Sequence, residues 1–182
     1  MMEPVKPVGM KNMSKKCDNT SVAIIVGDRA GKILLIERKK YNPGFALPAG
    51  HEDGDGAEAA AKKELFEEVG LNALIMNLVL IKNLKNPCKR DGGNYHVWVV
   101  FVAQKWEGEV KKSDEEVKSF IWADEKKVLD LARKLEKFIE ENKLSTYDLP
   151  ALVKATNESE GWKKNPGLEP SMYVLFKELK II

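Results

Sequence analysis

Short apolar runs separated by polar turns are the first pattern that the chain shows. Five such runs are rich in β-branched and aromatic residues and therefore predict strands. They cover residues 20–26, 32–37, 74–84, 95–106 and 117–122. Residues 28–31 have a turn composition between the first two runs, so we expect these two runs to form a hairpin of buried strands.

Helical periodicity predicts the other main elements. Residues 57–69 are rich in Ala, Leu, Glu and Lys, and Gly70 follows at a position where helices often end in a left-handed residue. A second helix is expected after Asp124, because apolar residues recur there at helical spacing opposite a charged face. Asp148 before a proline predicts another helix start, and residues 172–179 predict a short last helix.

Paired strands with helices between them predict an α/β fold, specifically an α/β/α sandwich with a mixed β-sheet between helices. Residues 1–16 contain Pro and Gly without periodicity and are expected to be a flexible N-terminal arm. Residues 17–145 are expected to form the main domain. Residues 146–182 are expected to be a C-terminal helical extension packed on it, with a loop at residues 161–170.

Composition excludes several classes of function. Thirty basic against 28 acidic residues among 182 give a formal charge of +2, so bulk charge offers no argument for a nucleic-acid or membrane partner. No apolar run approaches the ~20 residues of a membrane span. Cys17 and Cys88 are too few for a disulfide framework or a zinc site with ordinary ligand pairs, and His51 and His96 add little to a metal case. We therefore expect a reduced, cytoplasmic protein.

The most informative segment is the predicted helix at residues 57–69. Glu64, Glu67 and Glu68 stand at i, i+3 and i+4, which places three carboxylates on one helix face. Like charges repel there unless a cation lies among them, and oxygen ligands at this density suit Mg²⁺ or Mn²⁺. Taken alone, adjacent glutamates on a helix are more often a solvated face. The glycine-rich loop before the helix and Gly70 after it favour the metal site.

This segment resembles the Nudix box of the Nudix hydrolases. The family pattern is Gly, five residues, Glu, seven residues, then Arg-Glu-apolar-any-Glu-Glu-any-Gly-apolar. Three features depart from it: Lys63 replaces Arg, Asp55 replaces the first Glu, and the loop between Gly50 and Asp55 is one residue short. The helical half of the pattern matches at Glu64, Leu65, Glu67, Glu68, Gly70 and Leu71.

The resemblance extends over residues 20–140. Residues 46–50, Ala-Leu-Pro-Ala-Gly, look like the entry to the box in this family, with Ala49 in place of one Gly. Residues 116–124 look like its later strand and helix entry. A pattern of this length is specific enough to imply a Nudix-like fold.

The resemblance also implies an activity. Nudix hydrolases cleave a diphosphate linked to another moiety, here with Mg²⁺ as the expected cofactor and Mn²⁺ as a substitute. Glu64, Glu67 and Glu68 would be the metal ligands, and Glu67 and Glu116 are the catalytic candidates. Family members take the base from the box helix or from a later loop. We favour Glu116 in the acidic stretch 114–116, because it directly precedes a strand; a solvated turn is the alternative interpretation.

Substrate candidates lie after the box. Pro87 stands sixteen residues beyond Leu71, as in Nudix enzymes that act on ADP-ribose, which slightly favours ADP-ribose or an ADP-sugar. This spacing has low specificity, because proline is common in loops. Lys89 and Arg90 are candidates for holding a diphosphate, although most exposed basic residues only confer solubility. The remaining substrate-binding candidates are Arg38 and Trp98; aromatic residues in strands more often belong to the core.

Two alternatives stay open. One is a nucleoside triphosphate pyrophosphohydrolase, and the other is a non-catalytic Nudix domain that senses nucleotides. All three box carboxylates are present, which favours an enzyme. The expected partner is a small nucleoside diphosphate derivative, with no nucleic acid and no membrane, and a homodimer is left open.

Overall fold

A computed structural model describes residues 15–182 of the chain. Seven strands and five helices follow one another in this part. The strands are β1 (Thr20–Val26), β2 (Ile33–Arg38), β3 (Phe45–Ala46), β4 (Ala49–His51), β5 (Asn72–Leu84), β6 (His96–Glu107) and β7 (Val117–Ala123). The helices are α1 (Ala57–Val69), α2 (Glu125–Glu141), α3 (Leu149–Glu158), α4 (Glu160–Lys164) and α5 (Pro170–Glu178).

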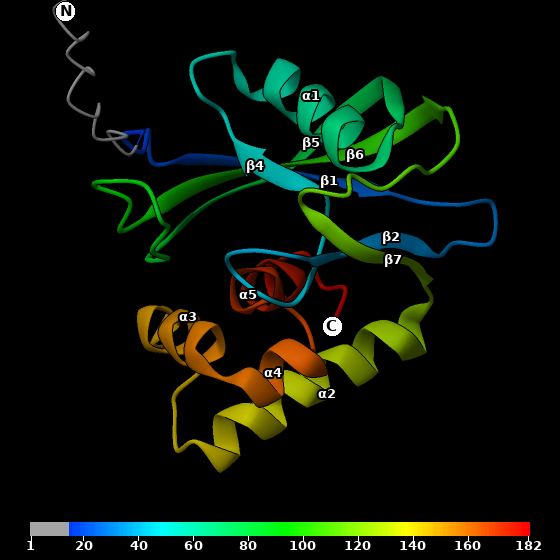
Figure 1. The fold of residues 1–182 in the computed structure, drawn as a ribbon. Helices are drawn as coiled ribbons and strands as arrows, with labels where there is room; N and C mark the ends of the chain where they lie inside the picture. Colours follow the sequence, from blue (N-terminus) through cyan, green and yellow to red (C-terminus); the bar gives the residue numbers. More distant parts are fainter. Residues whose placement is uncertain (1–14) are drawn as a thin grey trace, which may run out of the picture.

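The strands form two sheets between layers of helices. One sheet has the order β4-β1-β6-β5 and is mixed, because β1 and β6 run parallel while its other pairs are antiparallel. The other sheet has the order β3-β2-β7 and is antiparallel. Helix α1 covers one side of the sheets, and α2–α5 lie on the other (Figure 1). The predicted α/β sandwich with a mixed sheet is confirmed, with a second, smaller sheet beside it.

The predicted hairpin of β1 and β2 is wrong in its pairing. These strands belong to different sheets and are joined by a single bridge between Gly27 and Ile33. The reason lies in the continuous apolar run of β2, which is buried on both faces. Leu34 and Ile36 pack in the core under α1, whereas Leu35 packs in the core against the C-terminal helices. A strand buried on both faces takes its partners from the whole chain rather than from its neighbour in sequence.

Most predicted element boundaries are confirmed. Helix α1 covers residues 57–69, and Gly70 ends it with a φ of 72°, in the left-handed region. The side chains of Asp124 and Asp148 accept hydrogen bonds from Lys127 N and Ala151 N, so both cap a helix as expected. The five-residue helix α4 was missed, since residues 161–170 were predicted as a loop.

The C-terminal helices share a core with the sheets. Phe176, Leu175 and Trp162 are buried in the same cluster as Leu35 and Trp98. Trp162 also donates from its indole nitrogen to Pro43 O at 2.7 Å, which ties α4 to the loop after β2. The expected division of the chain at residues 145 and 146 stays a prediction, and the expected arm at residues 1–16 lies outside the described residues except for Lys15 and Lys16.

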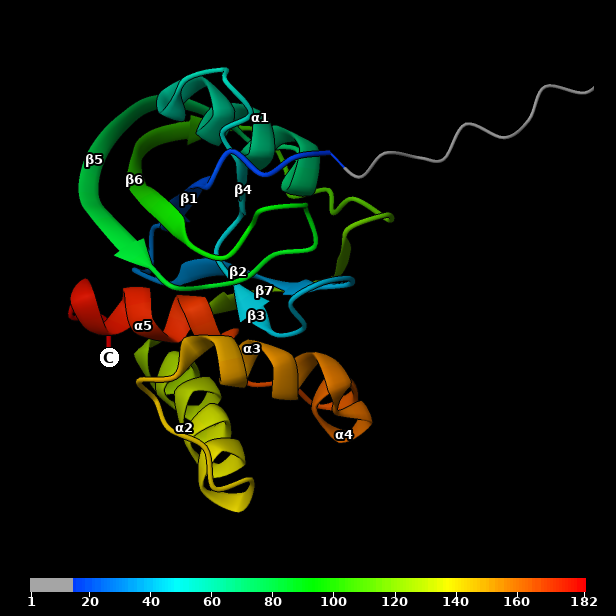
Figure 2. The ribbon, with the colours of Figure 1, turned by 90° about the vertical axis from the view of Figure 1, so that its left-hand side faces the viewer.

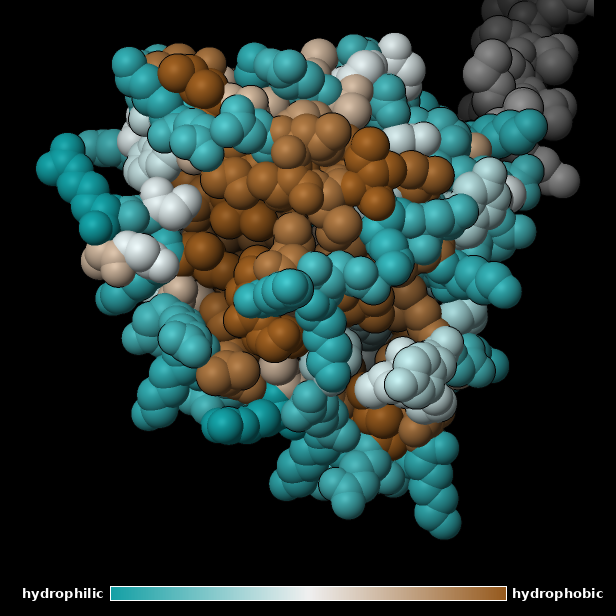
Figure 3. Space-filling model, turned by 180° about the vertical axis from the view of Figure 1, so that it is seen from behind, coloured by the Kyte–Doolittle hydropathy of each residue, from teal (hydrophilic) through white to brown (hydrophobic). Residues whose placement is uncertain are grey.

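Strand β5 presents an unusual outer surface. It is an edge strand, and three irregularities in its pairing with β6 accompany the curvature of both strands in Figure 2. Figure 3 shows a broad apolar area on the face that holds β5. Its exposed apolar side chains are Leu74, Ile75, Leu78, Val79 and Ile81. Apolar surface of this kind on an edge strand often marks an interaction site.

Among residues 15–182, every helix is too short or too polar to cross a lipid bilayer.

Candidate functional site

The carboxyl groups of Glu64 and Glu68 on α1 lie against the short strand β4. Glu68 is 2% exposed, and its Oε2 accepts a hydrogen bond from the backbone amide of Ala49 at 2.8 Å. Gly50 lies against Glu64 so closely that a Cβ atom there would overlap the Glu64 carboxyl group. A larger residue at this position would therefore displace the Glu64 carboxyl group from its observed place. Glu67, on the same helix face, is exposed.

Burial and mutual repulsion act on these carboxyl groups. Burial, together with the charges of Glu67 and Glu116, raises the pKa of Glu64 to about 7. Burial likewise raises the pKa of Glu68 to about 8, against the lowering effects of Arg38 and the Ala49 amide. Four carboxylates thus act on one another within a partly desolvated space. Such a donor set fits a hard divalent cation, because oxygen ligands with excess negative charge are what Mg²⁺ and Mn²⁺ bind.

Arg38 and Lys63 are the two basic residues that lower the pKa of Glu64, and they lie in different surroundings. Arg38, at the end of β2, has a larger lowering effect on the pKa of Glu64 than Lys63 has. Its guanidinium donates to Ala49 O at 3.3 Å. Lys63 instead pairs with Asp55 at 3.2 Å, and both side chains are about half exposed. The two residues that depart from the Nudix box are therefore bound to each other.

The shortened box loop closes through a tight turn. The amide of Asp55 donates to Glu52 O at 3.1 Å. The two residues between them have left-handed backbones, with φ of 55° at Asp53 and 83° at Gly54. Turns of this class require positive φ at both central positions. This turn joins the end of β4 to the residues before α1.

A pocket beside the carboxylates brings together most of the predicted site residues. Its lining includes Glu116 and all four substrate-binding candidates, namely Arg38, Lys89, Arg90 and Trp98. Glu116 lies in the turn just before β7, and its backbone oxygen accepts from Lys39 N at 2.8 Å. Glu169 and Met172 of the C-terminal segment also line the pocket, and the sequence analysis missed both.

The candidates differ in how free they are to bind a ligand. Trp98 is only 6% exposed, and its indole nitrogen donates to the side chain of Asn86 at 3.1 Å, so little of the ring is open to a stacked base. Arg90 is held by both oxygens of Asp53. The ammonium of Lys89 lies 5.5 Å from the ring centroid of Tyr41. Lys89 and Arg38 are therefore the more available of the four.

A comparison with protein-family models decides the family. The model described as NUDIX domain matches residues 18–142, more than half of the chain. The chain belongs to the Nudix family. It is accordingly a Nudix hydrolase, an enzyme that acts on diphosphate bonds. A search of curated proteins found no match.

Several solved structures share this Nudix fold. The MutT NUDIX hydrolase from Burkholderia pseudomallei is 23% identical, with a TM-score of 0.52, and the match covers 59% of this chain and 84% of that one. The mMutator MutT protein from Bacillus halodurans is 25% identical, with a TM-score of 0.50 over 61% of this chain and 71% of that one. The MutT protein from Methanosarcina mazei Go1 is 19% identical, with a TM-score of 0.50 over 78% and 94%.

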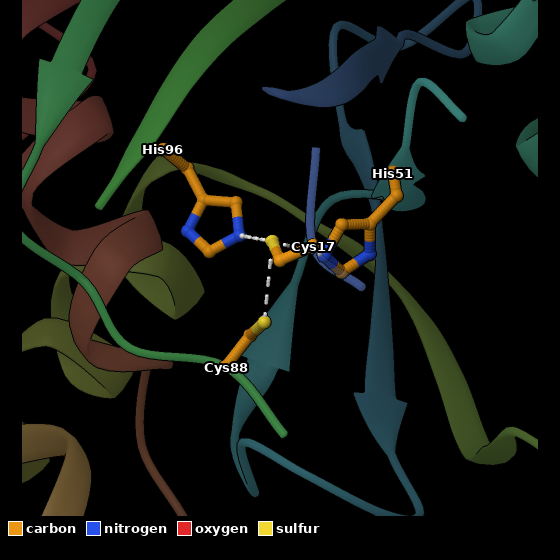
Figure 4. Close-up of side chains that lie close together, drawn as sticks. All are labelled: Cys17, His51, Cys88 and His96. Carbon is orange, nitrogen blue, oxygen red and sulfur yellow. Dashed lines mark hydrogen bonds between the residues drawn. The ribbon is translucent and has the colours of Figure 1, made fainter. Parts of the chain in front are cut away.

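This Nudix domain also contains a cluster that the sequence analysis discounted. Cys17, His51, Cys88 and His96 each place one ligand atom within 4.8 Å of all the others (Figure 4). Two cysteines and two histidines are thus enough to form a complete ligand set. The only signal in the sequence was that these are all the cysteines and histidines of the chain. Their spacing along the chain does not predict that they lie close together.

Proposed function

We propose that this Nudix hydrolase uses Mg²⁺ to cleave the diphosphate bond of a nucleoside diphosphate linked to another moiety. The observation that carries the proposal is the closeness of Glu64 and Glu68 to Arg38 at the edge of a pocket with further basic residues. A carboxylate cluster attracts a divalent cation, and basic side chains beside it attract the phosphates of the substrate.

In the proposed mechanism each residue has a separate task. Glu64, Glu67 and Glu68 hold the cation, with Mn²⁺ able to replace Mg²⁺. When bound, the ion neutralises charge on the phosphoryl oxygens and makes a nearby water more acidic. Glu116 takes a proton from the attacking water. The water oxygen bonds to one phosphorus, and the bridging P–O bond breaks with its electron pair on the leaving phosphate.

Arg38 and Lys89 are proposed to bind the diphosphate, and Arg90 and Trp98 to shape the pocket around the rest of the substrate. ADP-ribose or an ADP-sugar is the slightly favoured substrate, supported by Pro87 in the pocket lining at the family-like spacing from the box. A proline in this loop also has an ordinary structural explanation. Analysis of the reaction products is therefore needed to identify the preferred substrate.

The decisive experiment is to incubate the protein with diphosphate compounds and Mg²⁺ and to identify the products by mass. The proposal expects AMP and a sugar phosphate from ADP-ribose. A nucleoside monophosphate and inorganic diphosphate from a nucleoside triphosphate would instead identify a triphosphate pyrophosphohydrolase. Tight nucleotide binding without turnover would identify a sensor and contradict catalysis.

Glu67→Gln tests the role of the box carboxylates. Loss of a ligand charge is expected to lower kcat by about a hundredfold or more. Glu58→Gln is the matched control, because Glu58 lies on the same helix but pairs with Lys62 on the surface at 2.7 Å. Comparable turnover in the two variants would contradict the assignment of Glu67.

Assembly and location remain predictions. In a homodimer, the exposed apolar face of β5 would be available as the contact surface between the two chains. Light scattering across a range of protein concentrations measures whether two chains associate. A cytoplasmic location, without nucleic-acid or membrane partners, is retained from the sequence.

A further inference from the structure

The cluster of Cys17, His51, Cys88 and His96 lies outside the carboxylate site and has no task in the proposed hydrolysis. Its members come from four separate places: the segment before β1, the end of β4, the loop between β5 and β6, and the start of β6. We propose that these four side chains bind a Zn²⁺ ion in a closed structural site. This inference does not depend on the proposed hydrolase function.

The distances between ligand atoms suit a tetrahedral zinc ion. Zinc with bonds of about 2.3 Å to sulfur and about 2.05 Å to nitrogen separates two sulfurs by about 3.8 Å and a sulfur from a nitrogen by about 3.6 Å. Cys17 Sγ lies 3.5 Å from Cys88 Sγ, 3.2 Å from His96 Nε2 and 3.5 Å from His51 Nε2. These separations agree with the tetrahedron to within a few tenths of an ångström. The remaining distances between ligand atoms are at most 4.8 Å, so a small inward rotation of the side chains completes the site.

The second nitrogen of His96 is already held as in a metal-binding histidine. His96 Nδ1 lies 2.9 Å from the backbone oxygen of Asn86. A carbonyl oxygen only accepts hydrogen bonds, so Nδ1 carries the proton in the neutral ring and Nε2 presents its lone pair toward Cys17. A backbone carbonyl that fixes the tautomer in this way is a regular partner of zinc-binding histidines. The ring is 1% exposed, so this orientation is well fixed.

Both sulfurs receive backbone hydrogen bonds suited to thiolates. The amide of Asn19 donates to Cys17 Sγ, and the amide of Arg90 donates to Cys88 Sγ, each at 3.3 Å and each two residues beyond its cysteine. Such bonds stabilise negative charge on a coordinating sulfur. Gly93 permits the close approach, because a Cβ atom at that position would overlap Cys88 Sγ.

The ligand set selects the metal and its task. Two thiolates and two imidazoles are a common zinc set, whereas Mg²⁺ prefers oxygen ligands. Four protein ligands leave no open position for water or substrate, so the ion is structural. His51, Cys88 and His96 also line the pocket beside the carboxylates. Zinc would therefore fix the pocket wall at residues 86–90 against β4 and the segment before β1.

Metal content and cobalt spectroscopy test the proposal on the full-length chain. Protein purified without chelators is expected to contain about one zinc per chain by elemental analysis. After reduction and metal removal, Co²⁺ should produce thiolate-to-cobalt charge-transfer absorption and the visible bands of a tetrahedral ion, and Zn²⁺ should displace it. Because the chain has only two cysteines, this absorption reports on this site alone.

Cys88→Ser is expected to weaken Co²⁺ binding at least tenfold and to remove part of the charge-transfer intensity. Glu67→Gln is the matched control, because it should lose hydrolysis but keep one zinc per chain. A failure of the hydrolase proposal can therefore be distinguished from a failure of the zinc proposal. The Cys88→Ser substitution can also unfold the protein, so a second measurement uses the wild type. Alkylation of its two thiols is measured with and without Zn²⁺, and zinc should protect both thiols from the reagent. Reduced, folded wild-type protein that neither binds Zn²⁺ nor shows tetrahedral cobalt bands would overturn the proposal. A Cys17–Cys88 disulfide whose reduction does not restore zinc binding would overturn it equally.

Discussion

The backbone amide of Ala49 donates a hydrogen bond of 2.8 Å to Oε2 of Glu68, across the contact between β4 and α1. This bond satisfies one oxygen of a carboxyl group that is 2% exposed. Glu68 is therefore attached to the strand that enters the Nudix box, and its ionisation affects how firmly helix and strand are joined. Without a cation, burying its charge is unfavourable.

Stability without added Mg²⁺ should fall as pH rises. The pKa values of Glu64 and Glu68 rise in the folded protein from 4.5 to about 7 and about 8. At these two carboxyl groups the folded chain keeps protons that the unfolded chain has lost between pH 4.5 and 8. His51 and His96 have lowered pKa values and act in the opposite direction, but only below about pH 6.5, so the free energy of unfolding decreases above that pH. Urea unfolding at about pH 6.5 and about pH 8 measures the change. Chelators are left out, since they would also strip a zinc ion.

Two comparisons check this prediction. Glu68→Gln should flatten the pH dependence, because its side-chain oxygen still accepts from Ala49 but does not ionise. Added Mg²⁺ should restore the stability of the wild type at about pH 8 through binding to the folded state. A wild type that becomes more stable between these pH values would show that other groups dominate.

Gly50→Ala should distort the carboxylate site. The added Cβ would overlap the Glu64 carboxyl group, and we expect a loss of about 1–3 kcal/mol in the free energy of unfolding together with reduced kcat. Gly27→Ala is the control, because the nearest atom to its added Cβ is Lys32 O at 3.9 Å. Equal effects of the two substitutions would mean that contact with Glu64 does not constrain Gly50.

Glu116→Gln tests the source of the general base. Removing a base is expected to lower kcat about a hundredfold or more, with a smaller effect on KM. Glu115→Gln is the neighbouring control, since Glu115 is exposed and does not line the pocket. If Glu116→Gln retains wild-type turnover, the base belongs to the box helix, and Glu67 becomes the first candidate.

Lys63→Ala should change kcat/KM by no more than a few-fold. Its ammonium pairs with Asp55 on the surface, and such pairs contribute little. Asp55→Asn should have a similarly small effect, and the double variant should add nothing further. A tenfold or larger loss in Lys63→Ala alone would show that Lys63 acts directly on Glu64 during turnover.

The sequence predicted the parts of the fold that depend on local signals. Helix α1 was predicted with its observed bounds because Ala, Leu, Glu and Lys favour helix and Gly70 adopts the left-handed conformation. The pairing of β1 could not be predicted, because its parallel partner β6 follows some seventy residues later. A five-residue helix such as α4 is too short for a periodic signal.

The distinction between local sequence signals and long-range contacts applies also to the candidate site. Glu64, Glu67 and Glu68 could be predicted as metal ligands because their spacing places them on one helical face. The pairing of Lys63 with Asp55 depends on the shape of the loop, which sequence spacing does not reveal. The cysteine and histidine cluster is the extreme case, since Cys17 and His96 are 79 residues apart and are brought together only by tertiary structure.

Strand β4 limits where this chain can gain or lose residues. Ala49 and Gly50 contact the carboxylates of α1, and His51 contacts Cys17. An insertion or deletion within the strand would shift its register by one residue and send each side chain to the opposite face, which would break all three contacts together. Length changes are therefore tolerated only in the turn at residues 52–56. The box loop is shortened in this turn, and a homologue with a longer loop should carry its extra residue there.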